Sequence, residues 1–239
     1  LTGECADEIF GGYPWFYRED LLQSDTFPWM IDLTPRKQLL KPEFADSLQI
    51  EDYVKNLYHQ VISEIPVLPE ESDIEKSRRR IGYMNIRMFM QTLLDRMDRT
   101  SMYNGLEARV PFADIHLLQY VFNVPWEYKY RNQTEKSLLR HAAVNLVPNE
   151  ILFRKKSPYP KTYNPLYEII LADRLKEVIY DTSSPVNQFL DQKAVMQFLK
   201  SPKDYGKPWY GQLMAGPQMM AYLLQINFWL KEYRISIEL

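Results

Sequence analysis

The first thirteen residues hold the densest group of side chains that could do chemistry. Gly3, Glu4, Asp7 and Glu8 follow a short apolar start and a threonine, so carboxylates enter a predicted helix directly after a glycine. This order is typical of a strand-to-helix turn, where parallel α/β sheets bind ligands. Glu4 and Asp7 are three positions apart, so on one helical turn they would share a face and suit Mg²⁺. The alternative is that the acids only complement the positive end of the helix dipole.

A second charged segment covers residues 98–114. Its charges alternate with apolar residues between an apolar helix and Pro111, and burying them is costly unless each charge is paired. Such a network is either structural or part of a substrate-binding site. We predict that Glu107 and Arg109 are structural and hold the turn, whereas Arg99, at the end of the apolar helix, fits either role.

The third segment consists of residues 135–140 and, after a break at Pro148, residues 154–156. Basic side chains near a predicted helix start oppose the helix dipole, which is unfavourable unless an anion lies nearby. Taken singly, Lys136 and Lys156 are typical of exposed surface lysines. Their placement beside a helix start makes them candidates for binding a negatively charged group.

Helices are the elements that must position these segments. Apolar residues repeat at three- and four-residue spacing, and the pattern predicts helices over residues 54–65, 86–97, 115–122, 138–146, 166–179 and about 217–234. Prolines separate these stretches, and most methionine and aromatic residues in them are predicted to fill the core. No alternating run predicts a sheet beyond a short strand at Leu1. The fold class is therefore mainly α.

Composition excludes several classes of protein. The chain has 239 residues with ordinary globular composition, and 29 basic against 31 acidic residues give a net charge of −2. No overall positive field attracts nucleic acid or an anionic membrane, and the longest apolar run is far shorter than the roughly 20 residues that span a bilayer. The single cysteine, Cys5, closes no internal disulfide, and no leader precedes it, so we expect a cytoplasmic protein.

Taken in order, the three segments resemble the synthetase domain of the glutamine-dependent asparagine synthetases, members of the ATP-pyrophosphatase superfamily. The resemblance lies in four motifs: Thr2–Tyr13, Asp98–Asp114, Lys136–Arg140 and Arg154–Lys156. It implies that residues 1–239 form the helical carboxy-terminal half of an adenine-nucleotide-hydrolase-like α/β domain, truncated at its amino terminus. The family's pyrophosphate loop and its glutaminase domain would lie upstream, so we expect this chain alone to be inactive. The last 80 residues match no motif.

The resemblance also implies an activity. ATP would activate the side chain of aspartate as β-aspartyl-AMP, and ammonia from the glutaminase domain would displace AMP to give asparagine. Asp7, with Glu8 as a weaker candidate, is similar to the family carboxylate that binds Mg²⁺ and pyrophosphate. A homodimer is a candidate assembly.

The remaining site residues are assigned by the same motifs. Lys156 matches the catalytic lysine that contacts the α-phosphate and acyl oxygen, and Gly3 lets the nucleotide approach the backbone. Glu4 stands where the family meets the substrate amino group or accepts a proton during ammonia attack. Support on the phosphate side is the predicted role of Lys136, Arg99 and Arg140.

Two substitutions depart from the family pattern. Thr2 replaces a serine and keeps the hydroxyl, whereas Cys5 replaces a glycine, which predicts a backbone angle that cysteine resists.

Two other functions stay open. One is a β-lactam-forming or other amide-forming synthetase of the same superfamily, although the β-lactam-forming relatives carry tyrosine where Glu4 stands. The other is a non-catalytic helical interaction domain, in which the charged motifs are structural.

Overall fold

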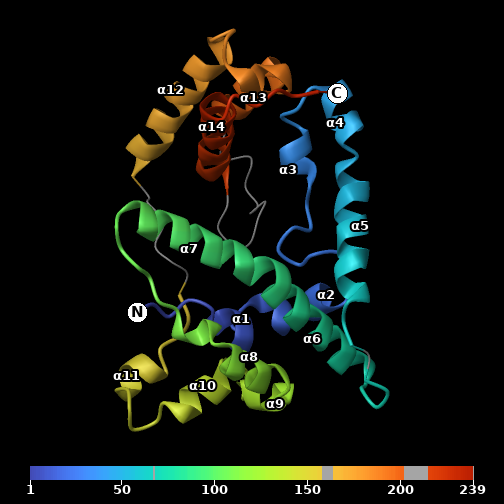
Figure 1. The fold of residues 1–239 in the computed structure, drawn as a ribbon, viewed down its shortest axis with the longest axis vertical. Helices are drawn as coiled ribbons and strands as arrows, with labels where there is room; N and C mark the ends of the chain where they lie inside the picture. The colour runs from blue at the N-terminus through green and yellow to red at the C-terminus, as the bar shows by residue number, and fades with distance from the viewer. Residues whose placement is uncertain (67, 158–163, 202–214, 239) are drawn as a thin grey trace. The chain divides into compact units, whose positions relative to one another are not determined.

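The computed structural model describes residues 1–66, 68–157, 164–201 and 215–238, and the chain divides into two compact units. The first unit comprises Leu1–Asp25 and Tyr58–Ser157, and the second comprises Thr26–Leu57 and Pro158–Leu239. Helices make up most of both units, which confirms the mainly α prediction (Figure 1). In the described part of the chain, no helix is long and apolar enough to cross a membrane.

The first unit contains many short helices and one long one. Its elements are α1 (Ala6–Phe10), η1 (Pro14–Phe16), α2 (Glu19–Leu22), α6 (Asp73–Met84), η2 (Asn85–Met90), α7 (Gln91–Tyr103), η3 (Pro111–Ala113), α8 (Ile115–Phe122), α9 (Trp126–Lys129), β1 (Tyr130–Arg131), β2 (Thr134–Glu135), α10 (Ser137–Ala142) and α11 (Asn149–Leu152).

The second unit is built from two segments that lie far apart in the sequence. Its elements are α3 (Thr34–Lys37), α4 (Pro42–Leu48), α12 (Pro165–Tyr180), η4 (Pro185–Gln188), α13 (Gln192–Lys200) and α14 (Gly216–Glu232), and α5 (Ile50–Ser63) begins in this unit and ends in the first. The predicted helices 115–122, 166–179 and 217–234 are confirmed as α8, α12 and α14.

A continuous helical stretch runs from Asp73 to Tyr103 as α6, η2 and α7. It begins at a capping box, in which the Ser72 backbone N–H donates to the Glu75 carboxylate at 2.9 Å. The predicted helix 86–97 lies inside it, and α6 extends it because charged residues form helices well even without an apolar stripe. The middle segment, η2, is a π-helix, a form that is frequent at functional sites.

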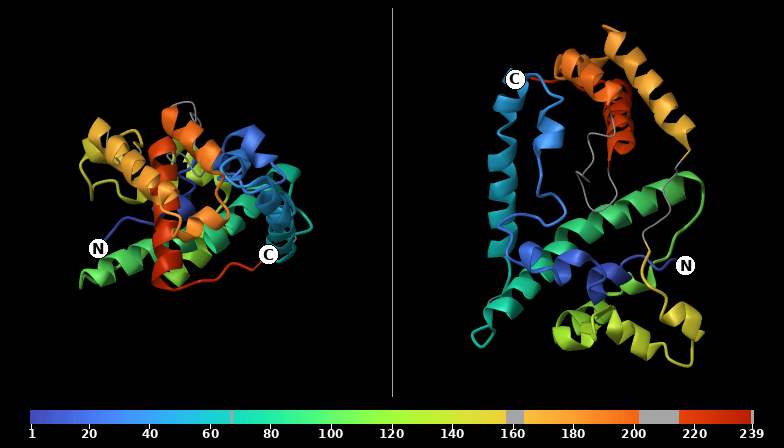
Figure 2. Two further views of the ribbon diagram at one scale, coloured as in Figure 1. Left: turned by 90° about the horizontal axis from the view of Figure 1, so that it is seen from above. Right: turned by 180° about the vertical axis from the view of Figure 1, so that it is seen from behind.

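In the first unit, α1 lies between this long helix and the helices α8 and α10 (Figures 1 and 2). A buried apolar cluster joins α1 to the helices on its two sides and comprises Cys5, Ile9, Phe10, Met90 and Val121. Burial of these side chains holds α1 in place, because a five-residue helix has little stability of its own. Packing from both sides thus sets the position of α1.

A tight hairpin, not a strand at Leu1, supplies the sheet of the described residues. Strands β1 and β2 pair antiparallel, and both residues of the connecting turn, Asn132 and Gln133, have positive φ, as a two-residue hairpin requires. The predicted strand at Leu1 was wrong. Thr2 makes one backbone hydrogen bond, to the Arg109 carbonyl at 3.0 Å, and one bond does not form a ladder.

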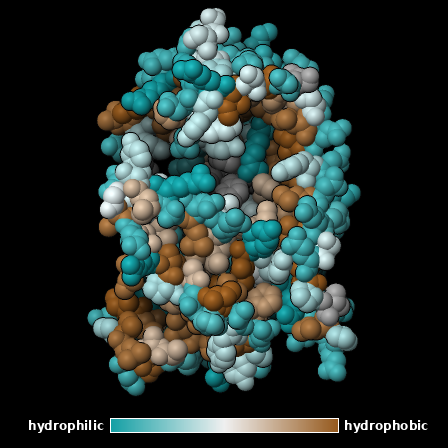
Figure 3. Space-filling view, viewed as in Figure 1, coloured by the Kyte–Doolittle hydropathy of each residue, from teal (hydrophilic) through white to brown (hydrophobic). Residues whose placement is uncertain are grey.

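The predicted helix 138–146 is shorter in the structure, because α10 ends at Ala142. Asn145 has a φ of 66°, a left-handed angle that interrupts a right-handed helix. Hydrophobic side chains are exposed beyond this point: Leu146, Ile151 and Phe153 are each more than half exposed. Figure 3 shows hydrophobic residues gathered on the surface at this end of the first unit.

The second unit has an apolar core. Buried side chains from α4, α12, η4, α13, α14 and the segments next to α4 and η4 form it, namely Leu39, Phe44, Leu175, Ile179, Val186, Phe189, Leu190, Val195, Phe198, Met219, Met220, Leu223 and Leu230. Two backbone hydrogen bonds tie the early segment to the late one, Lys41 N–H to the Phe189 carbonyl at 2.8 Å and Asp191 N–H to the Leu39 carbonyl at 2.9 Å. These bonds and the shared core unite the two segments.

Candidate active site

The site begins at the turn into α1, where Cys5 has a left-handed backbone with a φ of 71°. The prediction of a backbone angle that cysteine resists is confirmed, since a left-handed residue other than glycine costs roughly 1–2 kcal/mol. The thiol is fully buried in the apolar cluster, and this burial, with the negative charges of Glu8 and Glu4, raises its pKa to about 12. Cys5 is therefore a packing residue and an unreactive thiol.

Asp7 is the centre of a charged cluster. Its Oδ1 accepts a hydrogen bond from Lys136 Nζ at 2.7 Å and lies 3.3 Å from Lys156 Nζ. The side chains of all three residues are between 20% and 27% exposed, so the cluster is sheltered but open on one side. Three of the predicted site residues, from three separate motifs, are thus brought together.

Two further residues complete what we call the Asp7 cluster: Asp7, Gly12, Tyr13, Lys136 and Lys156. Lys156 Nζ donates to the Gly12 carbonyl at 2.8 Å and lies 4.2 Å from the centre of the Tyr13 ring. A Cβ on Gly12 would lie 1.8 Å from Asp7 Oδ1, so only glycine leaves room for the carboxylate. Burial lowers the pKa of Lys156, while the Asp7 carboxylate opposes that shift.

Glu8, the next residue on α1, forms no ion pair with these lysines within the described residues. Its side chain is buried, and Oε1 accepts a hydrogen bond from the Tyr13 hydroxyl at 2.6 Å. Burial raises its pKa, although the bond from Tyr13 opposes the shift. The hydrogen bond from Tyr13 links Glu8 to the Asp7 cluster, and Tyr13 is a residue of the first motif to which sequence reasoning gave no role.

Asn85 anchors α1 to the long helical stretch formed by α6, η2 and α7. Its fully buried side chain donates from Nδ2 to the Glu8 backbone carbonyl at 3.2 Å. A buried polar residue in an apolar helix face was the signal that could have revealed it. Because Asn85 opens the π-helical segment η2, the irregular turn and the placement of α1 are linked.

Glu4 does not share a helical face with Asp7, because α1 begins at Ala6, after the turn at Cys5. The Glu4 carboxylate turns instead to α7, where Oε1 accepts from Arg96 Nη2 at 2.9 Å. Its other oxygen, Oε2, is buried and has no hydrogen-bond donor among the described residues. Gly3 is exposed, and nothing lies within 4 Å of where its Cβ would stand.

Arg99 is not brought to the cluster. It is exposed on α7, and it makes no ion pair or side-chain hydrogen bond within the described residues. Arg96, one turn earlier on the same helix, is the residue that pairs with Glu4, and sequence reasoning missed it. Arg96 and Arg99 are three positions apart, so helix geometry places them close together on α7. Only the packing of α7 against the turn before α1 decides which of them meets Glu4.

Arg140 holds the segment that carries Lys156. Its guanidinium pairs with Glu135 Oε1 at 2.9 Å and donates to the carbonyls of Leu152 and Arg154. The same Glu135 oxygen accepts from the Lys156 backbone N–H at 3.3 Å. The pair is mostly buried, with 11% and 19% of the side chains exposed, so Arg140 acts as a positioning residue for Lys156.

The second motif, residues 98–114, contacts the backbone of the turn before α1. Glu107 and Arg109 pair with each other at 3.0 Å, with both side chains exposed, and the Arg109 carbonyl accepts from Thr2 N–H. The pairing agrees with the predicted structural role. Thr2 Oγ1 in turn accepts from Glu4 N–H at 3.3 Å, so the hydroxyl shared by serine and threonine shapes the turn before α1.

Asp7 fits a divalent cation as a single carboxylate ligand. No group of three or more metal-ligating residues occurs among the residues that the structure describes. Mg²⁺ needs few protein ligands, because it commonly binds one or two carboxylates together with substrate phosphates. The Asp7 carboxylate is sheltered by two lysines whose charges also suit phosphates, whereas the Glu8 carboxylate is buried against Tyr13.

Known proteins resemble the whole chain. Residues 1–231 match the asparagine synthase family. Asparagine synthetase [glutamine-hydrolyzing] 3 of Bacillus subtilis is 45% identical over 239 residues, which is all of this chain and 39% of the relative. Asparagine synthetase [glutamine-hydrolyzing] 1 of the same organism is 27% identical and covers 84% of this chain and 36% of the relative.

The human asparagine synthetase [glutamine-hydrolyzing] is 43% identical over 67 residues, 27% of this chain and 12% of its own length. The chain thus spans well under half the length of these curated relatives. The family match and the similarity along the whole of this chain agree with the four sequence motifs. The chain belongs to the asparagine synthase family.

Proposed function

We propose that this chain supplies the aspartate-activating side of an asparagine synthetase. In that reaction, ATP converts the aspartate side chain to β-aspartyl-AMP with release of pyrophosphate, and ammonia then displaces AMP to give asparagine. The single observation that carries the proposal is the convergence of Lys136 and Lys156 on Asp7, which gathers charges of both signs in one sheltered place. A site that brings a carboxylate against a polyphosphate needs such fixed charges.

The two lysines would bind and orient the phosphates. Lys156 is fixed at both ends, since its backbone bonds Glu135 and its Nζ bonds the Gly12 carbonyl. It would stabilise the negative charge that develops on the α-phosphate and acyl oxygens. Lys136, held at a left-handed turn before α10, would contact the pyrophosphate side.

Asp7 would hold Mg²⁺ when nucleotide binds and draws the lysines toward its phosphates. The bound ion would supply Lewis-acid stabilisation of phosphate oxygens. Glu8 is a weaker candidate for the same ion, because its carboxylate would have to leave Tyr13.

Glu4 would act on the amine side of the reaction. Oε1 is held by Arg96, so Oε2 has a fixed position and is free to accept an N–H of the substrate amino group or a proton from attacking ammonia. Gly3 beside it leaves open space in which a nucleotide could approach the backbone. A carboxylate here favours the asparagine reaction over β-lactam formation.

The remaining parts of the reaction would come from outside this chain. We propose that a pyrophosphate loop and a glutaminase domain complete the site and supply ammonia. The chain alone would then release no pyrophosphate, because the phosphates would lack the backbone donors of that loop.

The test is the Mg²⁺ dependence of aspartate-dependent pyrophosphate release by the full-length protein. Asp7→Asn keeps the shape of the side chain and removes its charge, so we expect slower release and a weaker response to Mg²⁺, with a smaller change in aspartate binding. Asp114→Asn is a matched control, because Asp114 only caps α8. An unchanged Mg²⁺ titration in Asp7→Asn would refute the assignment and favour a non-catalytic interaction domain.

A further inference from the structure

The ring of Tyr13 is fixed by aromatic neighbours. Its centre lies 4.4 Å from the centre of the Trp15 ring in a stacked arrangement, and 5.5 Å from that of Phe89, which meets it edge-on. Trp15 and Phe89 are themselves buried and pack against each other at 5.3 Å. Because aromatic pairs prefer these two geometries, the three rings hold one another in a defined orientation.

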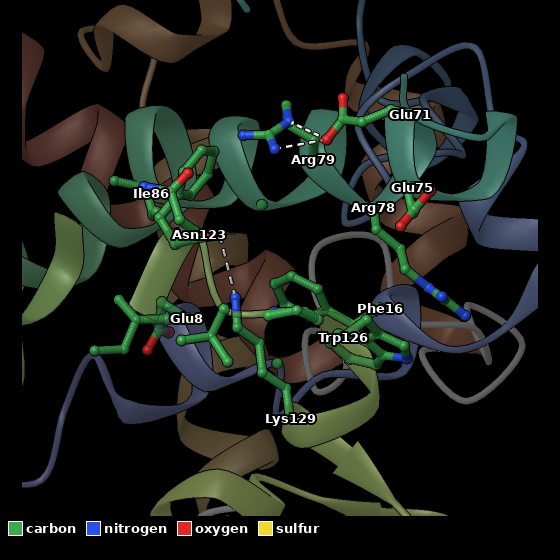
Figure 4. A pocket seen from close by; sticks show the side chains of 16 residues that line it. Glu8, Phe16, Glu71, Glu75, Arg78, Arg79, Ile86, Asn123, Trp126 and Lys129 are labelled. Carbon is green, nitrogen blue, oxygen red and sulfur yellow. Dashed lines mark hydrogen bonds and ion pairs between the residues drawn. The ribbon is translucent and has the colours of Figure 1, made fainter. Parts of the chain in front are cut away.

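The hydroxyl of Tyr13 is fixed as well. It donates to Glu8 Oε1 at 2.6 Å, and the Glu8 side chain is buried. Glu8 lines a pocket of about 180 Å³ among α1, α6, α8 and α9, and neither Asp7 nor Lys156 is among the lining residues (Figure 4). The hydroxyl therefore ties the ring to α1 through a carboxylate that forms no ion pair with the lysines of the Asp7 cluster.

Lys156 lies over this fixed ring. Its Nζ is 4.2 Å from the ring centre, within the roughly 6 Å at which an aromatic face attracts an ammonium group. The same Nζ donates to the Gly12 carbonyl at 2.8 Å and lies 3.3 Å from Asp7 Oδ1. Two of these three partners are neutral and adjacent in the sequence, and only Asp7 carries a charge.

The neutral partners differ from Asp7 in what they leave available. A carboxylate neutralises the charge of the ammonium group, whereas a carbonyl oxygen and a ring face orient the group and leave its net charge in place. Lys136 shows the contrast, since among the described residues its Nζ bonds only to Asp7. If Asp7 binds Mg²⁺, Lys136 loses this partner, while Lys156 keeps the Gly12 carbonyl and the Tyr13 ring.

We infer that Tyr13 is a positioning residue for Lys156: the face of its ring holds the ammonium group in place when Asp7 turns to the metal and the nucleotide. This inference rests on the catalytic role proposed above for Lys156. The ring acts through its negative face, and the bond from the hydroxyl to Glu8 sets its tilt. A packing role alone would need only apolar bulk at this position.

The experiment compares Tyr13→Phe, which keeps the ring, with Tyr13→Leu, which keeps apolar bulk without a ring. Lysine acylation of the full-length protein without ligands, at one pH and mapped by mass spectrometry, reports how firmly each ammonium group is held. We expect Lys156 to be labelled about three- to tenfold faster in Tyr13→Leu and at close to the wild-type rate in Tyr13→Phe. Equal rates for Lys156 in Tyr13→Leu and the wild type overturn the inference.

Two controls separate the ring from general loosening. Lys136, in the same cluster, should keep its wild-type labelling rate in both Tyr13 variants. Tyr17→Leu is the matched control, because Tyr17 is a partly buried tyrosine of the same segment whose ring stacks on Tyr130 at 4.7 Å. Faster labelling of Lys136 together with Lys156 in Tyr13→Leu, or of Lys156 in Tyr17→Leu, overturns the inference, since loss of packing would then explain the result.

A series of fluorinated rings guards against a Tyr13→Leu variant that does not fold. Increasingly fluorinated phenylalanine in place of Tyr13 keeps the shape of the ring and withdraws negative charge from its face in steps. The labelling rate of Lys156 should rise with each step, because the attraction depends on that charge. One rate throughout the series contradicts the inference and supports a packing role.

Turnover links the ring to the reaction. In Tyr13→Leu, kcat for aspartate-dependent pyrophosphate release should fall about three- to tenfold with smaller changes in the Michaelis constants, and Tyr13→Phe should retain most of the wild-type kcat. Unchanged kcat in Tyr13→Leu, despite faster labelling of Lys156, overturns the positioning role. Failure of the proposed function is seen differently, as an unchanged Mg²⁺ titration in Asp7→Asn while the labelling of Lys156 still depends on the ring.

Discussion

The two units differ in what they bury. The first unit shelters ion pairs: Glu135–Arg140, Glu71–Arg79 and Asp7–Lys136 all have side chains less than 30% exposed. The second unit shelters an apolar core, and the ion pairs among its described residues lie on the surface, namely Lys37–Glu51, Lys176–Asp173 and Lys231–Asp181.

This difference separates stability from function. Surface pairs contribute little, typically about 0–1 kcal/mol, so the second unit depends on apolar burial. Sheltered charges cost desolvation free energy and are weak evidence for stability. A region that keeps them, as the first unit does around Asp7, is where a chemical role is expected.

The largest expected effect is on the stability of the second unit. Leu175→Ala should destabilise it by about 2–5 kcal/mol, because Leu175 is fully buried in the apolar core and its truncation leaves a cavity. Denaturant unfolding measures this loss, and Leu166→Ala, at an exposed position of the same helix, is the control. A loss below 1 kcal/mol in Leu175→Ala would show that this core is loosely packed.

Lys156→Ala should act on turnover rather than on stability. Loss of one donor to a developing negative charge typically costs about 3 kcal/mol, so kcat for aspartate-dependent pyrophosphate release should fall by more than the Michaelis constants rise. The exposed neighbour Lys155→Ala should have wild-type kinetics. A higher Michaelis constant for ATP with unchanged kcat would make Lys156 a ground-state anchor instead.

Arg140→Met should lower both the folding stability and kcat. It leaves the buried Glu135 carboxylate and the Leu152 carbonyl without their donor, which costs about 1–3 kcal/mol of folding stability. Because Arg140 also positions the Lys156 segment, kcat should fall too, with Arg131→Met as an exposed control. Reduced stability with unchanged kcat would remove Arg140 from the positioning role.

The smallest expected effects are changes of folding stability with pH, and these changes have opposite signs in the two units. Burial raises the pKa of Glu8, so the folded first unit binds more protons, and its stability should fall as pH rises from the ordinary value of 4.5 through the raised pKa. Hydrogen bonds from Ser183 and Ser184 lower the pKa of Asp181, so its contribution is lost as pH falls below the ordinary 3.8.

The corresponding variants test these slopes. Glu8→Gln should flatten the decline of first-unit stability above pH 4.5, and Asp181→Asn should reduce the acid sensitivity of the second unit. Thermal unfolding followed across pH 3–7 measures both. Identical pH profiles for Glu8→Gln and the wild type would mean that the Glu8 carboxylate is less sheltered than its contacts indicate.

Helices with an apolar stripe were predictable, and α8 has the predicted bounds Ile115–Phe122. The polar helix α6 and the hairpin at Asn132–Gln133 were missed, because their signals are charge-rich helix propensity and a turn without glycine. The strand predicted at Leu1 failed because strand pairing is decided by partners, not by local sequence.

The site was predictable as a set of residues but not as an arrangement. Asp7, Lys136 and Lys156 stood out by type and motif, yet Lys136 lies 129 positions from Asp7, and only the packing of α10 against α1 brings them together. Arg96 and Tyr13 act through contacts that no local pattern specifies. The division into two units was also not foreseen, because no linker separates them in the sequence.

A double-mutant cycle between Asp7 and Lys156 tests most directly whether the sheltered charges of the first unit act as one site. The measurement is kcat/KM for aspartate-dependent pyrophosphate release by the full-length wild type, Asp7→Asn, Lys156→Ala and the double variant. We predict that the double variant loses little more than the worse single variant, a coupling of at least about 1 kcal/mol. Losses that add to within about 0.5 kcal/mol would show two independent charges and contradict this account.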